Sequence, residues 1–278
     1  MTNTIDALGT TLAYDEAGQG GVPAVLVHGL GGGRWSWDAN LPALAASRRT
    51  IALDLAGHGE SAKPSIDYTI ATHVEILLGF LDAVRIDRAF LVGNSMGGLV
   101  SLTAALQRPD RVLGLVLANA AGATRFPIER LPADPRRFVG IPITIRPPDK
   151  IVEGYVRFLF VKQSGWHIDH SLARSRETLA RGDYPAQANA FLRSAVGVFE
   201  SDAGKRVREV RCPTLVVWGE ADRLLPRESP TVFAGIPGAR VERLAGVGHV
   251  PQMEASDRFN DLVSSFLAEV ESTARSAR

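Results

Sequence analysis

The stretch Gly93-Asn94-Ser95-Met96-Gly97 decides the fold of this chain, because it matches Gly-x-Ser-x-Gly between a strand-like and a helix-like segment. The apolar residues 89–92 predict a short buried strand, and residues 98–106 predict a buried helix. A strand that turns sharply into a helix needs glycine where side chains would collide, and it exposes the middle residue. Ser95 is therefore a candidate nucleophile at a helix N-terminus, where backbone N–H groups favour developing negative charge.

Composition limits the protein class. The 278 residues are 45% hydrophobic, enough for one large α/β domain, or for a domain with an insertion. The one cysteine, Cys212, is expected to be a buried inert thiol, and neither a metal site nor a cofactor is predicted. The N-terminus lacks a signal peptide and no apolar run approaches ~18 residues, so we expect a soluble cytoplasmic protein without a membrane partner. A net charge of +1 argues against nucleic acid as a partner.

Apolar segments alternate with segments of helical length. This alternation predicts a mostly parallel sheet covered by helices on both faces. The predicted strands are residues 24–27, 50–53, 89–92, 112–117, 214–218 and 240–244, with an antiparallel N-terminal strand at 11–14. The predicted helices of this core are residues 37–46, 70–84 and 257–273.

The alternation stops after Leu117 and resumes at Thr214. Because so long a structureless loop is uncommon in a compact domain, we interpret residues 123–208 as a helical cap, or lid, inserted into a core of 1–122 and 209–278. The cap has 15 Lys and Arg against 9 Asp and Glu, and 9 of the 19 aromatic residues. Its net charge of +6 suits either an acidic substrate or docking on the net-negative core. Its helices are expected around 149–161, 169–181 and 185–200.

Two later loops supply partners for Ser95. A serine nucleophile needs a histidine to take its proton and a carboxylate to orient that histidine. His249 follows the last predicted strand, and the glycines before it allow the loop to bend toward Ser95. Asp222 and Glu220 both follow the preceding strand, and Asp222 is the better candidate because it stands further past the strand end.

A glycine-rich turn, residues 28–33, follows the first buried strand. It would bring the backbone N–H of Leu30 opposite that of Met96, giving two donors for a tetrahedral oxyanion. A phosphate-binding loop is the alternative, but Gly-x-Gly-x-x-Gly is not properly formed here.

Five motifs in order resemble the α/β-hydrolase fold superfamily over nearly the whole chain: His28-Gly29, residues 54–61, the Gly93 to Gly97 turn, residues 218–222 and Gly248-His249. The resemblance implies a mostly parallel, twisted, eight-stranded sheet with helices on both faces and an inserted helical cap. It also implies that the 54–61 turn is structural, with His58 organising the loop. Some relatives place the acid after the earlier strand, where this chain reads Leu117-Ala-Asn119-Ala-Ala-Gly122 and offers no carboxylate.

The family resemblance narrows the chemistry. Haloalkane dehalogenases and epoxide hydrolases of this fold carry aspartate where this chain has Ser95. We expect hydrolysis of a small-molecule carboxylic ester through an acyl-enzyme, with Ser95, His249 and Asp222 as the triad. A lactonase is one alternative, and a receptor that binds ligand without turnover is another.

The sequence is also similar to the carbon–carbon hydrolases that act on meta-cleavage products, which favour Gly-Asn-Ser-Met-Gly-Gly as found at 93–98. That resemblance implies that Asn94 contributes to the pocket. It also implies that Arg174 or Arg176 stands near the position of the arginine that those hydrolases carry in their cap. Val250 departs from the aromatic residue common there. The candidate pocket residues are Gly29, Asn94, Trp166, Arg174, Arg176 and Val250. Monomer and homodimer both remain open.

Overall fold

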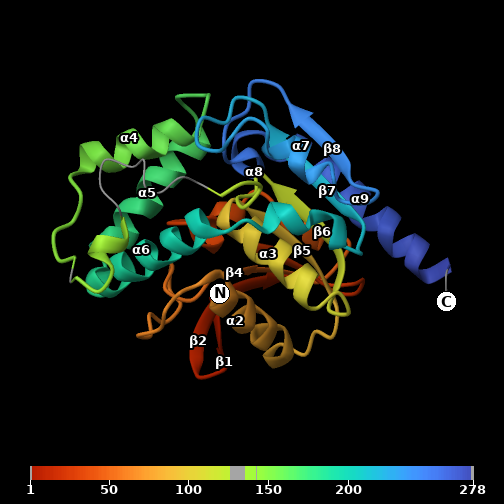
Figure 1. The fold of residues 1–278 in the computed structure, drawn as a ribbon, viewed down its shortest axis with the longest axis horizontal. Coiled ribbons are helices and arrows are strands. Elements are labelled where there is room, and N and C mark those ends of the chain that lie inside the picture. Colours follow the sequence, from red (N-terminus) through yellow and green to blue (C-terminus); the bar gives the residue numbers. More distant parts are fainter. Residues whose placement is uncertain (1, 126–134, 142, 277–278) are drawn as a thin grey trace.

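The computed structural model describes residues 2–125, 135–141 and 143–276, and it contains one central sheet between layers of helices (Figure 1). The sheet has the order β1-β2-β4-β3-β5-β6-β7-β8. Only the β1/β2 and β2/β4 pairs are antiparallel, so the expected mostly parallel eight-stranded sheet is confirmed. The strands are β1 (Asn3–Ala7), β2 (Thr10–Ala17), β3 (Ala24–Val27), β4 (Thr50–Leu53), β5 (Ala89–Asn94), β6 (Val112–Ala118), β7 (Thr214–Gly219) and β8 (Arg240–Leu244).

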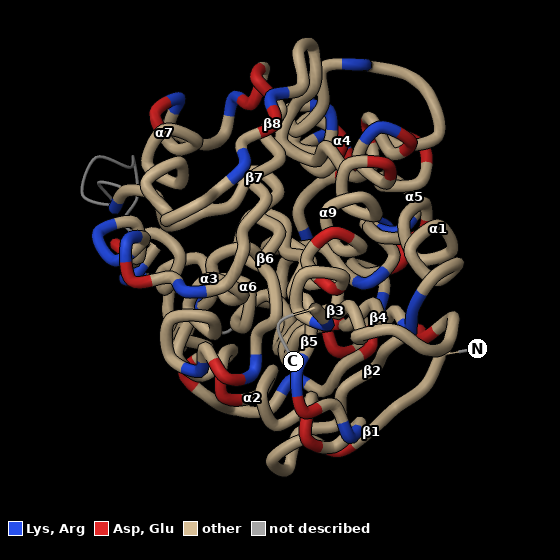
Figure 2. Tube along the Cα trace, turned by 90° about the vertical axis from the view of Figure 1, so that its right-hand side faces the viewer, with Lys and Arg blue, Asp and Glu red and all other residues tan. Residues whose placement is uncertain are grey.

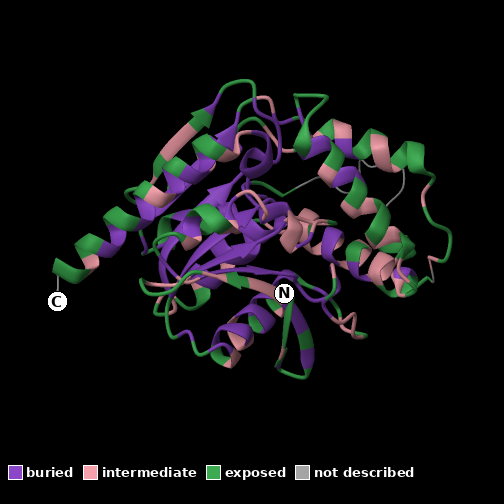
Figure 3. Cartoon of the chain, turned by 180° about the vertical axis from the view of Figure 1, so that it is seen from behind, coloured by how far each residue is buried: buried purple, intermediate pink, exposed green. Residues whose placement is uncertain are grey.

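Helices cover both faces of the sheet because the central strands are apolar on both sides. In β3, Val25 and Val27 join the core beneath α2 (Ile70–Ala83) and α3 (Met96–Gln107). The alternate residues Ala24 and Leu26 join the opposite core. That second core is covered by α1 (Leu41–Ala45) and α9 (Ser256–Ser276). Figure 3 shows the buried residues concentrated in the sheet and in the helix faces turned toward it.

Two local predictions were wrong. Residues 3–7 form a strand that was not expected, joined to β2 by a tight turn in which Leu8 and Gly9 have positive φ angles of 55° and 77°. The single helix expected over 37–46 is instead a 3₁₀ turn, η1 (Arg34–Trp37), followed by α1. Pro42 stands in the first turn of α1, where its missing N–H costs nothing and its ring prevents the preceding residues from continuing a helix.

The inserted segment lies between the neighbouring strands β6 and β7. It contains η3 (Pro135–Phe138), α4 (Asp149–Leu159), α5 (Trp166–Ala180), α6 (Tyr184–Glu200) and η4 (Ala203–Glu209). Its two ends meet where the Gly204 N–H donates to the Gly122 carbonyl oxygen over 2.7 Å. The boundaries 123 and 208 of the cap stay a prediction, and residues 126–134 and 142 of this segment lie outside the described residues.

Charged residues of both signs are interspersed over the inserted helices. Figure 2 shows Asp and Glu among the Lys and Arg of α4 and α5. Several pair within this segment, including Arg157 with Glu153 at 2.8 Å and Arg174 with Glu177 at 2.9 Å. Among the described residues, no helix is long and apolar enough to cross a membrane.

Candidate active site

Ser95 occupies a strained turn between β5 and α3. Its φ and ψ are 53° and −118°, a conformation that L-residues rarely adopt and that clusters at functional sites. Glycine is required on both sides: a Cβ on Gly97 would collide with the Val27 carbonyl oxygen, and one on Gly93 would lie 2.5 Å from the Gly98 nitrogen. The turn holds Ser95 at the carboxyl edge of the sheet, in front of the first turn of α3.

His249 and Asp222 form a buried pair at the same edge. The Nδ1 of His249 lies 2.8 Å from Asp222 Oδ2, and both residues are less than one-tenth exposed. Asp222 follows β7 and His249 follows β8, as their positions after two late strands predicted. With Nδ1 bound to the carboxylate, Nε2 is left for another partner. No hydrogen bond joins Ser95 to His249 within the described residues, although both line one cavity.

Asn119 is a partner of Asp222 that the sequence interpretation did not assign. Its side-chain amide donates to Asp222 Oδ2 over 2.7 Å, and its Oδ1 accepts the Gly219 N–H at 2.8 Å. The opposite carboxylate oxygen accepts the Leu224 N–H at 2.7 Å. Burial raises the pKa of Asp222, but the hydrogen bonds from His249, Asn119 and Leu224 outweigh it and hold that pKa below its usual value.

The glycine-rich turn after β3 lies against Ser95. A Cβ on Gly29 would be 3.1 Å from Ser95 Cβ, so only glycine brings the backbone this close. His28 anchors the turn from behind: its Nε2 accepts the Leu55 N–H at 3.0 Å, which leaves Nδ1 to donate to the Gly29 carbonyl oxygen at 2.7 Å. Complete burial lowers the pKa of His28 to about 4, consistent with a neutral ring.

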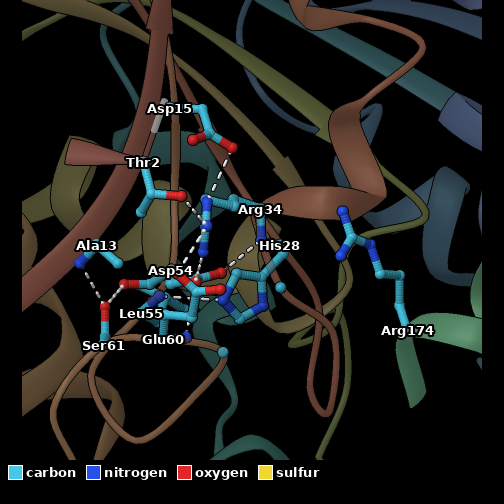
Figure 4. A network of polar contacts seen from close by, with 12 residues as sticks. Thr2, Ala13, Asp15, His28, Arg34, Asp54, Leu55, Glu60, Ser61 and Arg174 are labelled. Atoms are coloured by element: carbon cyan, nitrogen blue, oxygen red, sulfur yellow. Dashed lines mark hydrogen bonds and ion pairs between the residues drawn. The ribbon is translucent and has the colours of Figure 1, made fainter. Parts of the chain in front are cut away.

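A charged network holds the far end of the same turn (Figure 4). The Arg34 N–H donates to Asp54 Oδ1 at 2.6 Å, and the Arg34 guanidinium contacts Asp54 and also reaches Asp15 at 2.8 Å and Glu60 at 3.0 Å. Burial disfavours the charged guanidinium, but Asp54 and its acidic neighbours raise the pKa of Arg34 above its ordinary value. The network ties the glycine-rich turn to the 54–61 loop.

Two further buried histidines extend from His28. The rings of His28 and His58 are 5.2 Å apart, and those of His58 and His73 are 6.1 Å apart. Burial is the main cause that lowers the pKa of His58 and that of His73 to about 3. His58 bonds the Ala56 carbonyl oxygen at 3.1 Å. Its place inside the 54–61 loop agrees with the structural role that the family resemblance implied.

A cavity of about 460 Å³ opens beside Ser95 and His249. Among the described residues that line it, none is Lys, Arg, Asp or Glu. The glycine-rich turn and the sheet edge form its floor, and α4, α5 and α6 form its roof. Lining residues that bear on the chemistry are Gly29, Leu30, Asn94, Ser95, Tyr155, Ser171, Ser175, Ala195, His249 and Val250.

The structure separates the candidate pocket residues into two groups. Gly29, Asn94 and Val250 line the cavity, and Asn94 also donates to the His249 carbonyl oxygen at 3.1 Å. The other three do not line it, which corrects the prediction that they would. The residues outside the cavity are Trp166, Arg174 and Arg176.

Each of these three side chains has a partner elsewhere. Trp166 is about half exposed and stacks on His170, with ring centroids 4.7 Å apart. Arg174 points toward Asp38 and Glu177 and stands beside the charged network of Arg34 (Figure 4). Arg176 lies 3.5 Å from Asp149 on the surface.

The match to known proteins covers most of the chain. Residues 23–256 match the model of the alpha/beta hydrolase fold family. A 2-hydroxy-6-oxononadienedioate/2-hydroxy-6-oxononatrienedioate hydrolase of Paraburkholderia xenovorans is 34% identical, over 92% of this chain and 90% of its own length. The dihydrolipoyllysine-residue acetyltransferase component of the acetoin cleaving system of Pseudomonas putida is also 34% identical, but this chain spans only 65% of its length.

The fold is shared with a solved meta-cleavage product hydrolase from Pseudomonas fluorescens IP01. The two structures superpose with a TM-score of 0.82 and 26% identity, over 96% of this chain and 97% of the other. Together with the strained serine turn and the eight-stranded sheet, these matches show that the chain belongs to the alpha/beta hydrolase family.

Proposed function

We propose that this hydrolase cleaves uncharged carboxylic esters or lactones through an acyl-enzyme on Ser95. The observation that carries the proposal is the lining of the cavity beside Ser95 and His249, which among the described residues contains no Lys, Arg, Asp or Glu. An apolar cavity suits a neutral acyl group, because an unpaired carboxylate would lose its hydration there without gaining a partner.

The first half of the reaction uses the pair of His249 and Asp222. The Ser95 hydroxyl attacks the substrate carbonyl carbon while His249 Nε2 takes the hydroxyl proton. Asp222 stabilises the imidazolium through the 2.8 Å contact at Nδ1. The carbonyl oxygen becomes an oxyanion that accepts the N–H groups of Leu30 and Met96. Collapse breaks the bond to the alcohol oxygen, which leaves with the proton from His249.

The second half returns the enzyme to its starting state. Water enters the cavity, loses a proton to His249 and attacks the acyl carbon. The second tetrahedral intermediate collapses when Ser95 leaves with the proton, and the carboxylic acid is released. In a lactone the alcohol and acid belong to one molecule, so the same steps open the ring.

The proposal is tested with p-nitrophenyl acetate and butyrate and with a γ-lactone. Wild-type protein should release p-nitrophenol, and Ser95→Ala should abolish release while folding normally. Ser101→Ala is the matched control, because Ser101 lies buried in α3 and its hydroxyl has no hydrogen-bond partner within the described part of the chain. This position should tolerate the change. A folded wild type that turns over none of these substrates would overturn the proposal.

Hydrolysis of a carbon–carbon bond is the second candidate, and the relatives favour it. The similar Paraburkholderia hydrolase and the superposing Pseudomonas structure both carry names of that activity. Asn94, Ser95 and Met96 also match the sequence pattern that meta-cleavage product hydrolases favour. Against it stands Arg174, whose guanidinium lies beside Asp38 and Glu177 instead of in the cavity.

A 2-hydroxy-6-oxo-dienoate separates the two candidates. The ester proposal expects turnover of the neutral esters to exceed that of the dienoate, and expects Arg174→Gln to leave ester turnover unchanged. Dienoate turnover that dominates and that falls in Arg174→Gln would instead support carbon–carbon hydrolysis. Saturable binding of these compounds without turnover would indicate that the protein is a ligand-binding receptor and not an enzyme.

A further inference from the structure

The loops that carry Asp222 and His249 both bind one short piece of the inserted segment, residues 157–162, which we call the α4 terminus (Figure 1). The backbone N–H of His249 donates to the Leu159 carbonyl oxygen at 2.8 Å. The guanidinium of Arg223, next to Asp222, donates to the carbonyl oxygens of Phe158 and Phe160, each at 2.8 Å. Both loops are therefore hydrogen-bonded to the end of the same helix.

The loop between β8 and α8, residues 245–250, carries His249 and is called the histidine loop. Glu254 in α8 (Pro251–Glu254) joins this loop to the α4 terminus a second time. Its Oε2 accepts the N–H of Gly248, the residue before His249, at 2.6 Å. Its Oε1 accepts the N–H groups of Val161 at 2.7 Å and Lys162 at 2.6 Å. Hydrogen bonds from backbone N–H groups to a carboxylate are stronger than neutral ones, and Glu254 is only 5% exposed.

The two segments approach too closely for any side chain at position 248. A Cβ on Gly248 would lie 2.5 Å from the Leu159 carbonyl oxygen and 3.1 Å from Glu254 Oε2. The backbones of the histidine loop and the α4 terminus are thus in direct contact. Glu254 itself is not among the described residues that line the cavity. Its side chain therefore touches the backbone on either side of this contact and does not touch the substrate space.

We propose that Glu254 is a positioning residue that holds His249 in register with the inserted helices, so that the roof of the cavity and the proton acceptor move as one body. This inference rests on the proposed role of His249 as the base. A carboxylate suits the position because both of its oxygens accept N–H groups. A glutamine would turn an N–H donor toward either Gly248 or the α4 terminus.

The test compares Glu254→Gln with wild type and with Glu153→Gln, a control on α4 whose exposed carboxylate pairs with Arg157. We expect kcat per titrated active site for p-nitrophenyl butyrate to fall at least tenfold in Glu254→Gln, with KM changed less than threefold. The rate constant for sulfonylation of Ser95 by phenylmethylsulfonyl fluoride should fall by a similar factor. Hydrogen exchange should accelerate at the amides of Gly248, Val161 and Lys162. Glu153→Gln should match wild type in every measurement.

Sulfonylation keeps the inference independent of the substrate, because it reports the reactivity of Ser95 even if no ester is turned over. A purely structural role would lower the melting temperature but leave kcat per active site and the sulfonylation rate unchanged, and that result would overturn the proposal. If Glu254→Gln does not fold, Arg223→Gln replaces it, since Arg223 is exposed and also binds the α4 terminus. Wild-type kcat and sulfonylation in Arg223→Gln would then overturn the proposal, and a shared loss would support it.

Discussion

Asn119 donates its side-chain amide to the same oxygen of Asp222 that lies 2.8 Å from His249 Nδ1. Asn119 directly follows β6, whereas Asp222 follows β7, so neighbouring strands supply the acid and its support. A φ of 38° at Asn119 suits asparagine better than most residues. The family resemblance also implies that some relatives carry the acid itself in the segment after this strand.

Exchanging the two side chains tests this relationship. Asp222→Asn should lower kcat by about ten-thousand-fold, because an amide facing His249 Nδ1 stabilises the wrong tautomer. Adding Asn119→Asp should recover at least about tenfold of that loss, since the new carboxylate accepts the amide introduced at position 222 and restores a negative charge near the imidazolium. Steady-state kinetics on p-nitrophenyl butyrate measure both steps. A double variant no more active than Asp222→Asn would contradict the prediction.

Alanine substitutions at a glycine of the strained serine turn and at a glycine of α4 should change the free energy of unfolding in opposite directions. Gly93→Ala places a methyl group 2.5 Å from the Gly98 nitrogen and should destabilise the chain by about 3 kcal/mol or more. Gly154→Ala in α4 meets no atom within 4 Å and should stabilise by about 0.5–1 kcal/mol, since alanine favours helix interiors. Urea unfolding followed by circular dichroism compares the variants, and equal stabilities would show that the turn is less crowded than described.

The buried histidines predict loss of stability in mild acid. Because the pKa of His28 is about 4 and those of His58 and His73 are about 3, the unfolded chain binds more protons than the folded one below pH 6.5. Stability is therefore complete above that pH and falls as pH decreases, by up to about 1.4 kcal/mol per pH unit for each histidine.

Urea unfolding at pH 7 and pH 5 measures this slope. His73→Gln should reduce this slope by the amount that corresponds to the uptake of up to about one proton on unfolding. His170→Gln, at a partly exposed surface position, serves as the control. A slope that His73→Gln leaves at the wild-type value would refute the assignment. The interval above pH 5 is chosen because most carboxylates titrate below it.

The size of the cavity predicts a shift in acyl preference. Ala195 on α6 is 5% exposed and lines the cavity, so Ala195→Phe should fill part of the 460 Å³. We expect kcat/KM for p-nitrophenyl octanoate to fall more than about tenfold while that for the acetate stays within threefold, because binding is lost only where the volume is needed. Parallel loss for both esters would place Ala195 away from the acyl group.

Residues at the ends of strands were predictable, because a parallel sheet brings its carboxyl ends to one edge. Ser95 and Asp222 each follow a clearly apolar strand, whereas His249 follows β8, in which three of five residues are charged. The structure brings all three residues to the same edge of the sheet. The sequence showed only that no carboxylate follows β6, and it did not indicate that Asn119 would support Asp222. Nothing in the spacing of Glu254 distinguishes it from an ordinary helical residue, since its role depends on contact with a distant segment.

The direction of side chains on the inserted helices could not be predicted. Arg174 directly precedes Ser175, which lines the cavity, yet a rotation of about 100° per residue turns Arg174 toward Asp38. Packing of Ile168 and Leu172 fixes that rotation. The apolar pattern of α5 is too weak to reveal it from the sequence alone.

The hydrogen bond between Gly204 and Gly122 closes the base of the inserted segment, so the two ends of this segment meet at one point of the α/β core. Such an insert can be exchanged for one of another length without altering the strands on either side. A different inserted segment could therefore change the roof of the cavity while the core keeps Ser95, Asp222 and His249. We expect such an exchange to succeed only if the new roof supplies a backbone partner for His249 where Leu159 now stands and one for Glu254 where Val161 now stands.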